Sequence, residues 1–121
     1  MLRAERRVAG VRFASMDAYG SPLHVASTVP EPYVHLDNRS LVLHDGRHCV
    51  MYASSAFPWV AETIRVLLEE QRATRQQGQN VFGGFVHGEH ATIYAGSVSQ
   101  LATTTLALTD LELLRARLGG R

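Results

Sequence analysis

The chain has 121 residues, of which 45% are apolar and 19% are charged, a composition typical of a globular protein of about one domain. Its 12 basic and 11 acidic residues leave a net charge of +1, which argues against nucleic acid or an anionic membrane as a partner. No apolar run is long enough for a signal peptide or a transmembrane helix, and we expect a cytoplasmic protein.

The N-terminal part of the chain predicts short strands separated by turns. Residues 7–17 alternate apolar and polar side chains, which indicates a strand, and residues 22–28 can return as a second one. Residues 33–37 predict another short strand. We expect strands near the N-terminus to provide a sheet edge that pairs with another subunit.

A hairpin is predicted around Asp45 and Gly46, because this dipeptide is a strong turn signal between apolar runs. The sequence leaves the register of this hairpin open. A three-residue loop would place His44 opposite His48, whereas a two-residue loop would pair His44 with Arg47. A slip of one residue turns His48 to the other face of the sheet.

The apolar period changes after Pro58 from that of a strand to that of a helix. One helix face is predicted to carry Val60, Ile64, Leu67 and Leu68. Pro58 suits the first turn of a helix, and Gly78 is a plausible end. The pattern therefore predicts a long helix over about residues 58–77.

Three aromatic residues, Tyr52, Phe57 and Trp59, cluster around the start of this predicted helix. Exposed aromatic side chains often mark a surface that binds a partner protein, which is one interpretation of the cluster. The other interpretation is a hydrophobic staple that fixes the angle at which the chain enters the helix.

A second hairpin is predicted around Gly88-Glu89, a two-residue turn that suits type II′ geometry. This turn would place His87 directly opposite His90, with Cβ atoms about 5 Å apart on the face turned away from the core. Residues 101–108 predict a further strand, and a capping-box pattern then predicts a short helix over about residues 110–118.

A hairpin followed by a helix thus occurs twice, in a loose internal echo over residues 41–77 and 81–118. The four hairpin histidines, His44, His48, His87 and His90, are candidate ligands for zinc or copper if the two hairpin tips are neighbours. Ordinary surface histidines are the competing interpretation. A pH-responsive interface is a further one, because clustered imidazoles titrate near neutrality.

No nucleophile elbow, P-loop or dinucleotide-binding fingerprint is present in the sequence. The single cysteine, Cys49, forms no internal disulfide, and we expect it to act as a small buried hydrophobic residue. His44, His48 or Tyr94 would be the acid or base of an enzyme with a pocket between sheet and helix.

These observations predict a single α+β domain, in which a twisted antiparallel sheet of about six to eight short strands packs on one long helix. The favoured function is a non-catalytic binding or assembly domain, either a homo-oligomer or a small subunit of a larger protein complex. The alternatives are a metal-binding protein that uses the paired histidines and a small-molecule-binding protein or enzyme. No cofactor is predicted outside the metal alternative.

Overall fold

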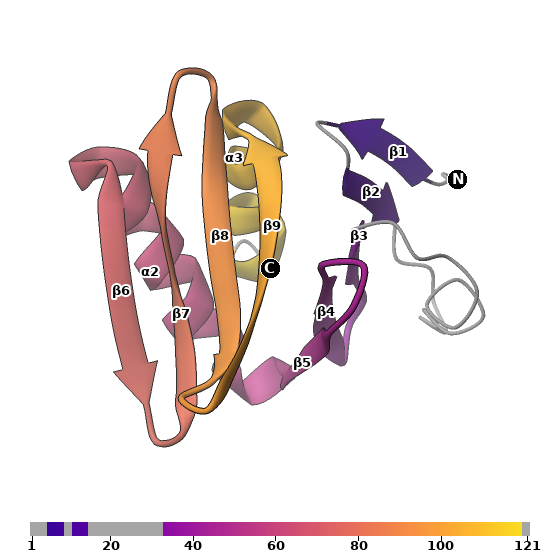
Figure 1. Ribbon diagram of the computed structural model, residues 1–121, viewed down its shortest axis with the longest axis vertical. Helices are drawn as coiled ribbons and strands as arrows, with labels where there is room; N and C mark the ends of the chain where they lie inside the picture. The colour runs from indigo at the N-terminus through magenta and orange to yellow at the C-terminus, as the bar shows by residue number, and fades with distance from the viewer. Residues whose placement is uncertain (1–4, 9–10, 15–32, 120–121) are drawn as a thin grey trace.

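The computed structural model describes residues 5–8, 11–14 and 33–119. Within them, the chain forms two β-sheets and two α-helices, whose arrangement is drawn in Figure 1. The strand expected over residues 22–28 lies outside the described residues. The α+β class that the sequence predicts is confirmed, but the strands form two sheets where one was expected.

The first sheet has five strands, which are in spatial order β1 (Glu5–Val8), β2 (Val11–Ala14), β3 (Tyr33–Leu36), β4 (Ser40–His44) and β5 (Cys49–Ala53). Neighbouring strands are antiparallel, except that β2 and β3 are parallel. The described part of the single strand expected over residues 7–17 belongs to two strands, β1 and β2, which pair antiparallel, and residues 9–10 and 15–17 lie outside the described residues. Consecutive residues of β4, from Leu41 to Leu43, are buried, so both faces of this strand are covered.

Helix α2 (Phe57–Glu70) follows a 3-10 turn, and Pro58 lies in its first turn as predicted. A proline is tolerated there because its missing N–H would have no partner within the helix. The predicted apolar face is also confirmed, since Val60, Ile64 and Leu67 are fully buried and Leu68 is half-buried against the core. This face packs against the second sheet and forms the centre of the core.

The prediction that this helix reaches residue 77 is wrong, because the helix ends at Glu70. Gln71 adopts a left-handed conformation with φ 69°, and its N–H donates to the carbonyl of Leu67 at 2.8 Å. The next six residues form strand β6 (Arg72–Gln77). This segment has no apolar face to hold a helix on the core, whereas its backbone pairs along β7.

The second sheet is an antiparallel meander in the order β6, β7 (Asn80–His87), β8 (His90–Ser97) and β9 (Gln100–Ala107). Each connection is a turn of two residues, and Gly78, expected to end the helix, opens the first turn with φ 61°. The β6–β7 turn and the β8–β9 turn lie at the same end of the sheet. A hydrogen bond joins them, in which the N–H of Val98 donates to the carbonyl of Gln79 at 3.1 Å.

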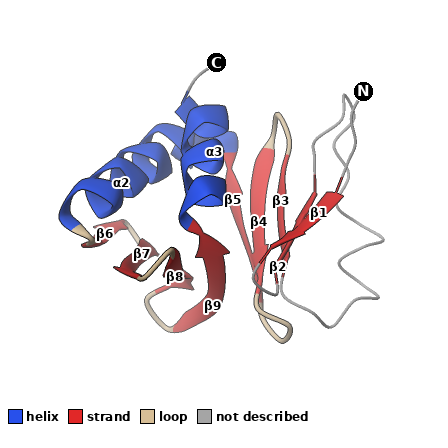
Figure 2. Cartoon of the chain, turned by 90° about the horizontal axis from the view of Figure 1, so that it is seen from above, coloured by secondary structure: helices blue, strands red, loops and turns tan. Residues whose placement is uncertain are grey.

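Helix α3 (Leu108–Gly119) begins directly after β9, two residues before its predicted start. Both helices cover the same face of the second sheet, as Figure 1 and Figure 2 show from two directions. The first sheet lies beside β9, and one core cluster contains residues of both sheets and both helices. No helix in the described part of the chain is long and apolar enough to cross a membrane.

Candidate interaction site

The β7–β8 turn has the geometry that the sequence predicts. His87 lies directly opposite His90 in the register of the two strands. Gly88, at the first position of the turn, has φ 63°, as a type II′ turn requires. The Nε2 atom of His87 is 2.8 Å from the hydroxyl oxygen of Thr92, which holds the imidazole against the sheet.

The β4–β5 loop differs from both registers that were considered. His44 lies opposite Cys49, so the loop contains the four residues 45–48. The physical reason is the Asp45 carboxylate, whose Oδ1 atom accepts the N–H groups of Arg47 at 2.8 Å and His48 at 2.7 Å. These two hydrogen bonds fix the turn so that its centre lies one residue further along the chain than the centre of a two-residue Asp45-Gly46 turn.

Asp45 also connects the two sheets. Its Oδ2 atom accepts the N–H of Thr103 in β9 at 3.2 Å and lies 3.7 Å from Nδ1 of His48. Burial raises the pKa of this carboxyl, but the hydrogen bonds from three backbone N–H groups and the nearby His48 outweigh burial, so the pKa lies below its usual value. The carboxylate is therefore the favoured form.

The two hairpin tips do not meet. The β4–β5 loop contacts β9 at Thr103, whereas the β7–β8 turn contacts the start of α3, where the N–H of Leu108 donates to the carbonyl of Glu89 at 2.9 Å. The strand from Thr103 to Ala107 rises by four residue steps, or about 13 Å. Within the described ranges, no group of three or more His, Cys, Asp or Glu residues is placed to hold a metal ion. His87 and His90 are thus paired, but they are not brought together with His44 and His48.

Cys49 is exposed, contrary to the expectation that it would be a buried hydrophobic residue. It lies directly opposite His44, whose Nδ1 atom accepts the N–H of Gly46 at 3.0 Å. Partial burial raises the pKa of the Cys49 thiol, which favours the thiol over the nucleophilic thiolate near neutral pH.

The expected aromatic partner surface is not formed by its three candidate residues. Tyr52, Phe57 and Trp59 are 2%, 9% and 8% exposed, so all three belong to the core. The ring of Tyr52 makes edge-to-face contacts with Trp59 and Phe82, with centroid distances of 5.9 and 6.1 Å. These contacts hold β5 and the start of α2 against the second sheet.

The hydroxyl of Tyr52 joins two strands of the second sheet. It donates to the carbonyl of Val81 at 2.5 Å and accepts the N–H of Gly96 at 3.1 Å, and these two residues lie directly opposite each other in β7 and β8. Burial raises the pKa of Tyr52 to about 12, although the bond from Gly96 lowers it. Tyr52 is therefore a structural link between the two sheets.

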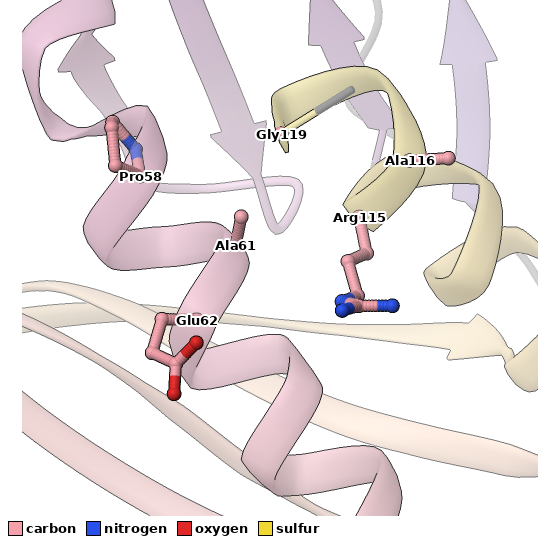
Figure 3. A pocket seen from close by; sticks show the side chains of 6 residues that line it. All are labelled: Pro58, Ala61, Glu62, Arg115, Ala116 and Gly119. Atoms are coloured by element: carbon pink, nitrogen blue, oxygen red, sulfur yellow. The ribbon is translucent and has the colours of Figure 1, made fainter. Parts of the chain in front are cut away.

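No histidine lines any of three shallow hollows on the described part of the surface. One of about 330 Å³ lies between α2 and α3, where Glu62 and Arg115 flank small side chains (Figure 3). Glu62 is already bound to Arg65, with 2.5 Å between Oε2 and Nη2. A second hollow, of about 250 Å³, is lined by Cys49 and Met51 of β5 together with residues at one end of the second sheet. The space between sheet and helix, where a pocket was expected, holds core side chains.

The third hollow, of about 500 Å³, lies on the face of the second sheet that the helices leave open. Arg72 is directly opposite Phe85, whose side chain is 46% exposed, and both residues line this hollow. On the other side of the hollow, the Tyr94 hydroxyl is hydrogen-bonded to the Thr74 hydroxyl. Gly83 lies between these two residues in the register, so the tyrosine ring passes over Gly83.

The two glycines of β7, Gly83 and Gly84, permit close packing of the neighbouring strands, and the register continues through them without a bulge. A Cβ atom at Gly83 would lie 2.5 Å from the carbonyl oxygen of Ala73. At Gly84 it would lie 2.2 Å from the carbonyl oxygen of Thr92. The pair of glycines therefore allows β6 and β8 to approach β7 closely.

Strand β6 borders this open face and has an unpaired edge. The N–H of Val86 donates to the carbonyl of Gln71 at 2.9 Å, which fixes the alternation of hydrogen bonds between β6 and β7. It follows that the N–H and C=O groups of Arg72, Thr74 and Gln76 point away from β7. No described strand lies beside them, and Figure 1 shows β6 at the outer border of the sheet.

Comparison of the chain with models of protein families, with curated proteins and with solved structures finds no match. The candidate site therefore depends on the geometry of this chain alone. It consists of the outward edge of β6 and the adjoining hollow, and we call it the β6 edge.

The sequence does not indicate the β6 edge, because it predicts a helix that includes residues 72–77, which form β6 in the structure. One signal was available. Gly78 and Gln79 lie between two segments that contain the β-branched residues Thr74 and Val81. This spacing is typical of a hairpin with a two-residue turn.

Proposed function

We propose that this chain is a non-catalytic binding and assembly domain that associates through the β6 edge. The observation that carries the proposal is the row of outward N–H and C=O groups at Arg72, Thr74 and Gln76. Such an edge accepts a strand from another polypeptide, because every added backbone hydrogen bond finds a partner already in position. The exposed ring of Phe85 adds apolar area beside the edge.

The other strand edges have fewer backbone groups available to pair with another chain. The outer edge of β9 is partly occupied, since Asp45 accepts the N–H of Thr103. Strand β5 lies against β8 and β9 of the second sheet. Strand β1, the N-terminal edge that the sequence suggested for subunit pairing, has four residues against six in β6. The longer edge forms more hydrogen bonds with a partner.

The composition of β6 also fits an edge that associates reversibly. Its sequence, RATRQQ, carries Arg72 and Arg75, and charged residues on an edge strand limit uncontrolled aggregation. We place this domain in the cytoplasm, because the lone Cys49 is exposed and has no internal cysteine with which to form a disulfide.

Light scattering on the purified chain tests the proposal. We expect a mass above the 13.3 kDa of one chain, rising with protein concentration over about a hundredfold range. Gln76→Pro removes an outward N–H without removing a bond to β7, so it should lower the mass to that of the monomer.

Gln76→Thr is the matched control. Both variants lose the bond from the Gln76 side chain to the carbonyl of Gly78, but only the proline variant loses the backbone donor. The control should therefore assemble like the unmodified chain. A mass of 13.3 kDa for the unmodified chain at every concentration would refute the proposal, and equal assembly of both variants would exclude the β6 edge as its surface.

A further inference from the structure

We infer that the partner at the β6 edge is a second copy of this chain, paired antiparallel about a two-fold axis that passes beside Thr74. This inference rests on the proposed function and adds the identity of the partner and the register of pairing. It follows from which backbone groups of β6 point outward and from where its two arginines lie.

The hydrogen bonds favour this register. Residues that point their N–H and C=O groups outward must face one another across an antiparallel pair. With Thr74 opposite Thr74 of the second copy, Arg72 faces Gln76 in both directions. All the outward groups of β6 are then used, in about six hydrogen bonds.

The neighbouring registers are worse for reasons of charge and length. A shift that centres the pair on Arg75 places two guanidinium groups directly opposite each other, which is destabilising. A shift that centres it on Ala73 sets Gln76 against Glu70, which belongs to helix α2 and not to the strand. Only the Thr74-centred register uses the full edge and keeps all like charges apart.

The register also brings opposite charges together across the interface. Arg75 would lie opposite Ala73 of the second copy, on the side of the sheet that carries the helices. Ala73 follows closely on the carboxyl end of α2, where Glu69 and Glu70 are exposed. Glu69 already binds Arg65, with 2.8 Å between Oε1 and Nη1. A cation there would therefore lie near the Glu70 carboxylate and the negative end of the helix dipole.

The product is one continuous sheet. The four strands of each copy form eight in a row, with the two β6 strands at the centre. Because the two-fold axis is perpendicular to the sheet, α2 and α3 of both copies cover the same face. On the open face, Gln76 of each copy comes beside Arg72 of the other, at the rim of the hollow that Phe85 lines.

Disulfide crosslinking measures the register. In a background with Cys49→Ser, Thr74→Cys places two thiols on residues whose Cα atoms are about 5.5 Å apart, within the range of a disulfide. We expect mild oxidation to give a covalent dimer of twice 13.3 kDa. The matched control is Gln76→Cys, whose two copies would be separated by about 14 Å and should crosslink at least about tenfold more slowly.

A second variant keeps the test decisive if a disulfide at Thr74 forms slowly. The double substitution Arg72→Cys with Gln76→Cys places thiols opposite each other at two positions, so it should crosslink although each single substitution does not. Faster crosslinking of Gln76→Cys alone would overturn the register. Failure of both the Thr74 and the double variant in a sample that light scattering shows to be dimeric would mean that assembly uses another surface. A strictly monomeric sample would instead refute the proposed function.

Discussion

The two hydrogen bonds of the Tyr52 hydroxyl predict that loss of this one oxygen atom lowers the stability of the folded chain. Tyr52→Phe keeps the ring, and with it the edge-to-face contacts to Trp59 and Phe82, but removes the bonds to Val81 and Gly96. Each bond contributes about 1 kcal/mol, and leaving two buried backbone groups without their partner adds to the loss. We expect the free energy of unfolding to fall by about 2–3 kcal/mol at neutral pH.

Urea unfolding followed by tryptophan fluorescence measures this difference, since Trp59 packs against Tyr52. Tyr94→Phe is the matched control. It removes a hydroxyl that bonds Thr74 on the open face, and it should change the free energy of unfolding by no more than about 0.5 kcal/mol. Equal effects of the two substitutions, or no measurable effect of Tyr52→Phe, would show that the hydroxyl does not join the sheets.

The same residue predicts a dependence on alkaline pH. Burial raises the pKa of Tyr52 in the folded chain to about 12, above the value of about 10 in an unfolded chain. The contribution of the neutral hydroxyl is therefore complete below about pH 10 and is lost as the pH rises toward 12. The stability difference between the native chain and Tyr52→Phe should shrink over this range. A constant difference would contradict the assignment.

Three further predictions concern the turns and strands. Asp45→Asn should remove the stability that the ionised carboxyl provides above about pH 4, so native and variant chains should converge in acid denaturation curves as the pH falls below that value. Gly84→Ala should lower the free energy of unfolding by more than about 2 kcal/mol, because the added Cβ atom would collide with the carbonyl of Thr92. The control is Gly119→Ala, whose Cβ atom would lie 3.5 Å from the nearest atom and which should be neutral or stabilising. Gln71→Gly should raise the midpoint of thermal unfolding and contribute about 0.5–1 kcal/mol, because glycine adopts the left-handed φ of 69° without strain; a lower midpoint would contradict this account.

Local signals in the sequence predicted the elements that depend on local physics. The β7–β8 turn was predicted because Gly88 permits the required φ, and strand parity then places His87 opposite His90. The start of α2 was predicted because Pro58 fits only its first turn, and the period of the apolar residues identified the face that is buried.

The features that the sequence did not predict depend on one unusual backbone conformation and on contacts between distant residues. The end of α2 requires a left-handed Gln71, a residue type that carries no signal for that conformation. The burial of Tyr52 depends on the second sheet, whose β7 and β8 supply both hydrogen-bond partners. The separation of the two histidine turns likewise depends on β9, because Asp45 docks midway along it and Glu89 docks at its end.

The hydrogen bonds between the hairpin turns and other segments limit where this chain tolerates an insertion. The β4–β5 loop, the β7–β8 turn and the pair of turns at Gln79 and Val98 each form a hydrogen bond with a segment outside their own hairpin. A peptide inserted at any of them, or new termini created there by circular permutation, would break a contact between elements as well as lengthen a connection. Reporter sequences inserted at these hairpin tips should therefore lower stability more than the exposed position of a hairpin tip suggests.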